Sequence, residues 1–447
     1  MIKRLFRKLV DVTDEELGAL LWATAYGFFI LFAYYILRAV RDEISSADRG
    51  NLQLLWTAVF LVMLGAVPLY SWLTSRFSRS VFVPLANRFF IACLLAFFLA
   101  LEILPEGARP WLDRVFYVWT SVFALFVVTV FWGFVNDCFS NAQGRRLYAF
   151  IAVGSSLGGI AGSSVTAVVA EIVPRFDLLL LACLPLEAAS WCVGPMSRWL
   201  AGKAVSGSGD TLADGGDESI ARANRPLAGN AWSGIREVFR SPYLMGIAAF
   251  IALMTFASTV LYFEQAYLVG QAIADRGART AFYARLDLAV NALTIVFQVY
   301  LTARIIRLIG VGLSLALVPG VVFLGFATLG TMPLLAVLVA VQVAYRAGRY
   351  GITRPAREIL FTVVGREQKY KSKAFVDTAV YRGGDLASGW IFAGLKALGL
   401  SLGAIALVAA PLAGAWAVLG YRLGRRQDEL AMASLDYPEG TTSAARR

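Results

Sequence analysis

Twelve stretches of about 20 predominantly apolar residues recur along the chain, and this repetition restricts the possible folds more than any other feature. A helix of roughly 20 such residues spans the hydrocarbon core of a bilayer, and a single soluble core does not hold so many. The composition agrees, since 58% of the 447 residues are apolar, only 16% are charged and the mean hydropathy is +0.66. The sequence therefore predicts an all-α membrane protein with twelve transmembrane helices.

The apolar runs locate the predicted spans to within several residues at each end. The spans are 17–37, 52–73, 81–104, 114–136, 147–173, 176–200, 242–270, 282–303, 309–331, 333–353, 372–395 and 401–421. The first run leads into the second without a small-residue cleavage site, so we expect a retained helix and not a signal peptide.

Residues 201–241 interrupt this pattern, because they are rich in Gly, Ser, Asp and Arg and too polar to pack. They predict a cytoplasmic linker between an N-terminal six-helix half (1–200) and a C-terminal six-helix half (242–426), followed by a cytoplasmic tail (427–447). Lys and Arg are in excess on the side that holds both termini and the linker, which predicts that this side is cytoplasmic.

The two predicted halves repeat each other weakly. LTSRFSR at 73–79 matches LTARIIR at 301–307, and the Ala-Phe and Gly-Gly pairs within 149–159 match those within 374–384. A parallel repeat of two six-helix halves with both termini inside resembles the major facilitator superfamily, in which the substrate site lies between the halves near the bilayer midplane. The glycines within 154–162 lie about four residues apart, which predicts close helix packing and not a phosphate loop.

The absence of histidine excludes several kinds of chemistry. Catalytic triads that need an imidazole and the usual metal sites are unavailable, and the four cysteines (Cys93, Cys138, Cys183 and Cys192) have no paired spacing. We therefore expect no enzymatic activity, no disulfide framework, no metal and no cofactor. The net charge of +11 follows from the membrane topology, so the lipid bilayer is an expected partner and nucleic acid is not.

Four arginines, Arg346, Arg349, Arg354 and Arg357, share one face of the predicted span 333–353 and its extension. An ionised side chain at mid-bilayer costs about 2.5 kcal/mol or more, so it usually faces a cavity or a partner. Because too few carboxylates lie nearby in the sequence, these arginines imply an anionic ligand, and guanidinium forks suit phosphate or carboxylate oxygens.

A second polar stripe follows in the span 372–395, where Asp377, Arg382 and Asp385 share a face. Glu187 lies near the middle of the span 176–200. Two interpretations remain open: Arg382 pairs with Asp385 or Glu187 in an internal network that holds or gates the bundle, or the stripe faces the substrate. Nearby Tyr345 and Tyr350, like Trp132, are candidates to stack on a nucleobase, although aromatic rings in membrane helices more often pack.

The first span ends in Arg38, Arg41 and Asp42, which share one face by their spacing. They form either an interfacial anchor at the outer surface or an outer gate with a phosphate contact. Glu264, toward the outer end of the span 242–270, is a candidate gate partner for Arg38 or Arg41.

Three stretches resemble the ATP/ADP translocases of plastids and intracellular bacteria, a divergent branch of the major facilitator superfamily. They are LRAVRDE at 37–43, FWGFVND with GRRLYAF at 131–150, and AREILFTVVGREQKYKSKAFVDTAVYRGGD at 356–385. The resemblance implies roles in nucleotide transport for Arg41 and Asp42 and for positions 357–358, 371–373, 377 and 382. The chain departs from the family pattern at Arg41, where members often have Lys, and at Asp385, where several have a basic residue.

Together these observations predict a monomeric antiporter of the bacterial inner membrane that exchanges anionic nucleotides, ATP against ADP by family analogy, by alternating access. The predicted substrate-binding residues are Arg41, Arg346, Arg349, Arg357 and Arg382, and the predicted gating or coupling residues are Arg38, Asp42, Glu187, Glu264, Asp377 and Asp385. One alternative is a proton-coupled carrier of another anionic metabolite or lipid. The other is a structural or assembly protein whose buried charges clamp the bundle.

Overall fold

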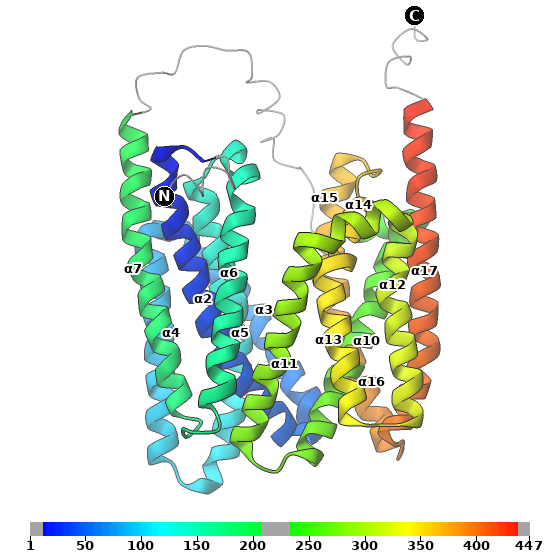
Figure 1. Ribbon diagram of the computed structural model, residues 1–447, viewed down its shortest axis with the longest axis horizontal. Coiled ribbons are helices and arrows are strands. Elements are labelled where there is room, and N and C mark those ends of the chain that lie inside the picture. The colour runs from blue at the N-terminus through cyan, green and yellow to red at the C-terminus, as the bar shows by residue number, and fades with distance from the viewer. Residues whose placement is uncertain (1–11, 207–232, 437–447) are drawn as a thin grey trace, which may run out of the picture. The chain divides into compact units, whose positions relative to one another are not determined.

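The computed structural model describes residues 12–206 and 233–436, and every regular element within these ranges is helical (Figure 1). Most of the predicted linker and the end of the predicted tail lie outside the described residues. Contacts divide the chain into one unit of Met1–Asp217 with Val269–Asn291 and a second of Glu218–Leu268 with Ala292–Arg447. Because these units group residues by contact and not by repeat, the predicted boundaries of the two halves stay a prediction.

The first unit is built around α2. Its helices are α2 (Asp14–Ala47), α3 (Leu52–Arg76), α4 (Arg79–Ile103), α5 (Arg109–Cys138), α6 (Asn141–Val169) and α7 (Asp177–Ser206), with the start of α11 (Arg276–Val296). Helix α2 packs against α5, α6 and α7. A Cβ on Gly158 or Gly162 of α6 would lie 2.1 or 2.4 Å from the carbonyl oxygen of Phe28 or Phe32 of α2, so the predicted packing role of these glycines is confirmed.

Capping boxes begin two helices of this unit. Thr13 and Glu16 start α2, and Ser140 and Gln143 start α6, so each pair satisfies backbone N–H groups that the first helical turn leaves without partners. Gln143 and Arg146 also donate to the Glu16 carboxylate, at 2.6 and 3.1 Å. The sequence signal that starts each helix therefore also ties the start of α6 to that of α2.

The second unit is held by a close pairing of α12 with α17. Its helices are α9 (Ser233–Arg240), α10 (Pro242–Ala272, most of it), α12 (Thr302–Thr331), α13 (Leu335–Gly348), α14 (Arg354–Leu360), α15 (Arg366–Phe375), α16 (Tyr381–Ala397) and α17 (Leu402–Asp436). A Cβ on Gly424 would lie 2.2 Å from the Cα of Gly312, and one on Gly403 would lie 2.8 Å from the carbonyl oxygen of Gly330. Small residues at both crossings let the two backbones meet.

Three π-helical turns interrupt the helices of this unit: η4 (Phe297–Leu301), η5 (Arg349–Thr353) and η6 (Val376–Val380). The Thr302 hydroxyl donates to the carbonyls of Phe297 (2.9 Å) and Gly351 (2.5 Å), which joins η4 to η5. Gly351 has no room for a side chain, because a Cβ would lie 2.5 Å from the Cβ of Phe297. Such turns are frequent at functional sites, and two of these three fall in the charged stripes that the sequence singles out.

Within the described residues, nine helical stretches are long and apolar enough to cross a membrane, and one of them, Arg276–Thr331, covers two predicted spans. The predicted all-α, multi-pass membrane architecture is confirmed. The spans predicted over 333–353 and 372–395 are not among the nine, and both contain charged residues that lower their hydropathy. The exact number of twelve stays a prediction.

Candidate functional site

Arg349, at the start of η5, is partly buried among neutral groups. Its Nη1 donates to the Ser258 hydroxyl at 3.4 Å and to the Tyr345 hydroxyl at 3.5 Å, and its Nη2 donates to the Tyr381 hydroxyl. The rings of Tyr350 and Tyr381 lie 5.7 and 5.5 Å from its Cζ, which is within cation–π range. No carboxylate in the described part of the chain forms an ion pair with this guanidinium. Its direct contacts are therefore hydroxyls and aromatic rings, and the Asp385 carboxylate interacts with it electrostatically from beyond ion-pair distance.

Three helices meet at Arg349, and small side chains set their distances. Thr255 and Ser258 lie three residues apart on one face of α10, and α16 approaches this face through Gly384, where a Cβ would lie 2.3 Å from the Thr255 hydroxyl. Tyr345 of α13 is buried and donates to the Met254 carbonyl at 3.5 Å. The surroundings of the guanidinium are thus fixed by α10, α13 and α16 together.

Arg382 and Asp385 lie on α16 beside Tyr381, and neither forms a direct ion pair with a described residue. Arg382 is exposed and Asp385 is partly buried. Glu187 does not pair with Arg382, because it accepts hydrogen bonds from Arg88 at 2.9 Å and from the Trp191 indole at 2.9 Å. Neither of the two ion pairs that the sequence left open for Arg382, with Asp385 or with Glu187, is present among the described residues.

Arg357 and Asp377, by contrast, come together. Arg357 donates to Asp377 at 3.0 Å and to Glu358 at 3.3 Å, and Lys373 donates to the other oxygen of Glu358 at 2.5 Å. Burial alone would raise the pKa of Glu358, but the hydrogen bonds and charges of Lys373 and Arg357 outweigh it and lower the pKa below its ordinary value. Arg357 thus has two carboxylate partners, whereas Arg349, two turns earlier, has none in the described part.

The end of α2 places the predicted gate residues against α11. The Nε of Arg38 lies 3.2 Å from Asp287 and 3.5 Å from Asp42, and Arg41 donates to Asp42 at 2.9 Å. The Cζ of Arg41 also lies 5.3 Å from the centroid of the Tyr117 ring. Both arginines of the LRAVRDE motif therefore have carboxylate partners within the first unit.

Glu264 is buried in α10, and neither of its carboxylate oxygens has a hydrogen-bond partner among the described residues. The sequence offered it as a gate partner for Arg38 or Arg41, but Arg38 pairs instead with Asp287. Arg346 of α13 is partly buried one turn before Arg349.

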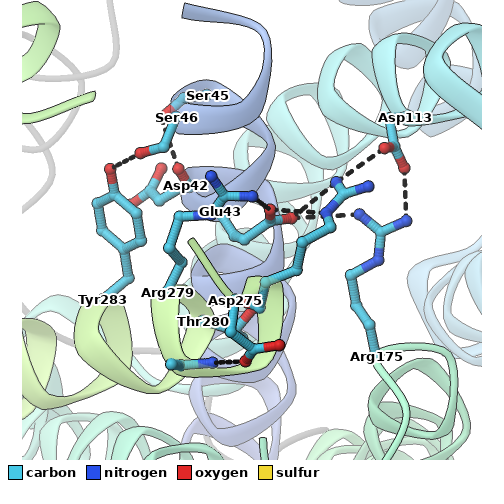
Figure 2. Close-up of polar contacts among 12 residues, drawn as sticks. Asp42, Glu43, Ser45, Ser46, Asp113, Arg175, Asp275, Arg279, Thr280 and Tyr283 are labelled. Carbon is cyan, nitrogen blue, oxygen red and sulfur yellow. Dashed lines mark hydrogen bonds and ion pairs between the residues drawn. The ribbon is translucent and has the colours of Figure 1, made fainter. Parts of the chain in front are cut away.

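A larger ionic cluster, which the sequence did not predict, lies beyond these residues on α2 (Figure 2). Its centre is Glu43, which is 0% exposed and accepts from Arg276 at 2.8 and 2.9 Å, from Arg279 at 3.1 Å and from Arg175 at 3.2 Å. Asp113 of α5 accepts from Arg175 at 2.7 Å and from Arg276 at 2.8 Å. We call these five residues the Glu43 cluster. Three guanidiniums and two carboxylates join α2, α5, the turn before α7 and the start of α11.

Hydroxyl and amide contacts continue this attachment along α2 and α11. The Ser46 and Tyr283 hydroxyls form a short hydrogen bond, and the Tyr35 hydroxyl donates to Asn291 at 2.9 Å. One signal was available in the sequence, since Asp287 and Tyr283 lie four residues apart in a predicted membrane span, with Arg279 a further turn away. Separation of α2 from α11 requires the Glu43 cluster and these contacts to break.

Known proteins resemble the chain in both sequence and structure. A family model described as TLC ATP/ADP transporter matches residues 101–182. ADP,ATP carrier protein 2 of Chlamydia pneumoniae is 24% identical over 99% of this chain and 95% of its own length. The chain is thus similar to ATP/ADP transporters over nearly its whole length. ADP,ATP carrier protein 1 of Chlamydia trachomatis serovar D is a second relative, 23% identical over 68% of this chain and 64% of its own length.

Solved transporter structures share the fold of this chain, which is the major facilitator fold. A D-xylose–proton symporter superposes with a TM-score of 0.61 at 14% identity, covering 91% of this chain and 96% of the symporter. A peptide transporter in complex with alafosfalin superposes with a TM-score of 0.58 at 15% identity, covering 94% of this chain and 99% of that one. At these identities the likeness establishes the fold alone. The stretch that matches the family model contains Asp113 and Arg175 of the Glu43 cluster.

Proposed function

We propose that this protein is an antiporter that exchanges ATP for ADP across the bacterial inner membrane by alternating access. In this proposal both termini are cytoplasmic, one monomeric chain is the transport unit and no cofactor takes part. The family supports the proposal, and so do the relatives, whose names describe ADP,ATP carriers.

The observation that carries the proposal is the Arg349 guanidinium without a carboxylate partner in the described residues. A charge in a membrane helix is costly unless a partner or a hydrated cavity compensates it. A phosphate group supplies two oxygens that match the guanidinium fork, and charge-assisted hydrogen bonds of this kind are stronger than those to neutral hydroxyls. Bound phosphate would therefore replace hydroxyl acceptors that solvate Arg349 only weakly.

The remaining predicted residues take roles around Arg349. Arg346 and Arg382 add positive charge on the same face of α13 and beside it on α16. Arg41 and Arg357, which already have carboxylate partners, exchange those partners for substrate during the cycle. Asp42 and Asp377 are then the groups released when this happens.

The Glu43 cluster serves as the outer lock of this cycle, together with the Arg38–Asp287 pair. With both termini cytoplasmic, as proposed, the C-terminal end of α2 lies on the outer side, and the excess of lysine and arginine in the loops supports this orientation. Because ion pairs tie α2 to α11 there, they must break for a pathway to open outward. Exchange of ATP for ADP moves about one net charge, so a membrane potential of 100 mV biases the exchange by about 2.3 kcal/mol.

Counterflow in proteoliposomes tests the proposal. Vesicles loaded with ADP should take up labelled ATP, and Arg349→Gln should reduce this uptake by about 100-fold, because two charge-assisted hydrogen bonds are lost. The matched control is Arg307→Gln, which removes an exposed arginine of α12 that donates to the Ala303 carbonyl and should exchange normally. Absence of counterflow with every nucleotide would remove the proposal.

A second candidate is a proton-coupled carrier of another anionic metabolite or lipid, and two carboxylates favour it. Glu264 and Asp385 lie in membrane helices, and neither has an ion-pair partner in the part of the chain that the structure describes. Such groups are suited to bind and release protons. Uptake driven by a pH gradient without internal substrate, and lost in Glu264→Gln or Asp385→Asn, would select this candidate over nucleotide exchange.

A further inference from the structure

An ion pair lies on an exposed face of the first unit, at the middle of two membrane helices. Nη2 of Arg88 in α4 donates to Oε1 of Glu187 in α7 at 2.9 Å, and the Trp191 indole donates to the same oxygen at 2.9 Å. The side chain of Arg88 is 59% exposed and that of Glu187 is 33% exposed. At about 1.5 Å per residue, each residue lies about 15 Å from one end of its helix, at the centre of a hydrocarbon core about 30 Å thick.

The surface around this pair is apolar and made of large side chains. We call it the α4–α7 face, and its exposed members are Leu85, Phe89 and Leu95 on α4 and Leu184 and Trp191 on α7. Gly194 continues the exposed line of α7 one turn after Trp191, and a Cβ there would meet nothing within 4 Å. Large exposed apolar side chains are typical of a surface in contact with lipid chains and not of a polar cavity.

A single copy leaves this pair in hydrocarbon, which is unfavourable. A guanidinium has five N–H donors, and Arg88 directs only its Nε and one Nη toward Glu187. Its other N–H groups have no protein acceptor among the residues described, and lipid chains offer none. Charged groups in membrane helices usually face the protein interior or a partner, and here the interior is on the other side of the helices.

We infer that the α4–α7 face is the interface of a homodimer. Copies inserted in the same orientation are related by an axis perpendicular to the membrane, so each residue meets partner residues at its own depth. Two copies of a face that carried only one sign of charge would repel each other. This face carries both signs, because Arg88 and Glu187 lie at the same depth in the membrane. Each Arg88 can therefore reach the Glu187 of the other copy, and Gly194 allows close approach.

This inference does not depend on nucleotide exchange, because it uses only α4 and α7. It gives Glu187, predicted from the sequence as a gating residue, a role in assembly. The result is a dimer of two complete transport units in place of the predicted monomer.

Complementary charge variants test the interface. Copies with Arg88→Glu carry two acidic groups on the face, and copies with Glu187→Arg carry two basic groups, so each variant alone should self-associate about tenfold more weakly. Co-expressed under two different affinity tags, the two variants should co-purify at the level of the wild type, because each acidic pair then meets a basic pair. Association that neither variant weakens, or no recovery on mixing, would overturn the inference.

A cysteine cross-link keeps the test decisive if the charge variants do not fold. In a background with the four native cysteines replaced, Leu184→Cys should give cross-linked dimers with a short bifunctional maleimide in native membranes. The matched control is Leu61→Cys on α3, which is 60% exposed against 69% for Leu184 and should remain uncross-linked. Three outcomes would each refute the dimer: equal cross-linking of the two variants, no cross-linked product from Leu184→Cys, or cross-linking of Leu184→Cys to a different protein.

Discussion

The Glu43 cluster and the surroundings of Arg349 both hold arginine within helical membrane protein, but they compensate its charge in opposite ways. In the Glu43 cluster, three guanidiniums share the four oxygens of two carboxylates at 2.7–3.2 Å. Arg349 has hydroxyls and aromatic rings around it and no described carboxylate within ion-pair distance. In the first arrangement the arginines form ion pairs within the protein, and these pairs attach helices to each other. In the second, the guanidinium has no ion-pair partner and is available to bind an external anion.

The comparison also separates stability from binding. A buried carboxylate that serves three arginines is costly to remove, because the arginines stay behind without an acceptor. Removal of an arginine that has no ion-pair partner should change the free energy of unfolding little, but it should weaken ligand binding strongly. Four predictions follow this contrast from its largest consequence to its smallest.

Glu43→Gln should lower the free energy of unfolding by about 3 kcal/mol, because Arg175, Arg276 and Arg279 lose a charged acceptor that is 0% exposed. Thermal or denaturant unfolding of the purified protein measures this loss. The matched control is Glu171→Gln, which breaks an exposed pair with Arg285 and should cost less than about 1 kcal/mol. Equal effects of the two substitutions would show that the cluster does not hold α2 to α11.

Arg349→Gln should leave the unfolding temperature without ligand unchanged or slightly higher, since no ion pair is lost. In the wild type, ATP at about 100 times its dissociation constant should add about 2.7 kcal/mol to stability, and in Arg349→Gln this gain should vanish at the same concentration. A ligand titration followed by thermal unfolding measures both. A variant that unfolds more easily yet still gains stability with ATP would place Arg349 with the Glu43 cluster as a structural residue.

Gly384→Ala should weaken ATP binding about tenfold, because its Cβ would lie 2.3 Å from the Thr255 hydroxyl and push α16 away from α10. Its neighbour supplies the control, since a Cβ on Gly383 would meet nothing within 4 Å and Gly383→Ala should bind normally. If both variants bind alike, the distance between α10 and α16 does not set the Arg349 site.

The smallest expected effect concerns pH. Burial opposes ionisation of Glu358, but Lys373 and Arg357 lower its pKa below the ordinary 4.5, so its contribution to stability is present above pH 4.5 and is lost as the pH falls through the lowered value. Because the side chain is 42% exposed, solvent screening keeps this contribution below about 1 kcal/mol. Unfolding followed from about pH 6 to about pH 3, the range in which carboxyl groups commonly titrate, should be slightly less pH-dependent in Glu358→Gln. An identical slope would argue against the ion pairs.

Prediction from the sequence succeeded where the signal lies within one segment. The apolar runs, the packing glycines Gly158 and Gly162, and the unusual charge of Arg349 can each be read from neighbouring residues. The spans at 333–353 and 372–395 were located but not their π-helical turns, because one extra residue per turn leaves the apolar pattern almost unchanged.

The partners of the charged residues could not be found in this way. Glu43 accepts from arginines 132 and 233 residues further along the chain, and Arg349 donates to a tyrosine 32 residues away. The sequence therefore could not tell which of Arg357 and Arg349 lacks a carboxylate partner and is available to bind an anionic ligand. The predicted shortage of carboxylates holds for Arg349 and not for Arg357.

By itself, the sequence determined that this chain is an all-helical membrane protein with charged residues inside predicted membrane spans. It could do so because the hydropathy of a segment depends only on consecutive residues. Only the tertiary structure decided which of those charges are neutralised. Ion pairs form over a few ångströms between helices that are far apart along the chain, so no local pattern specifies them.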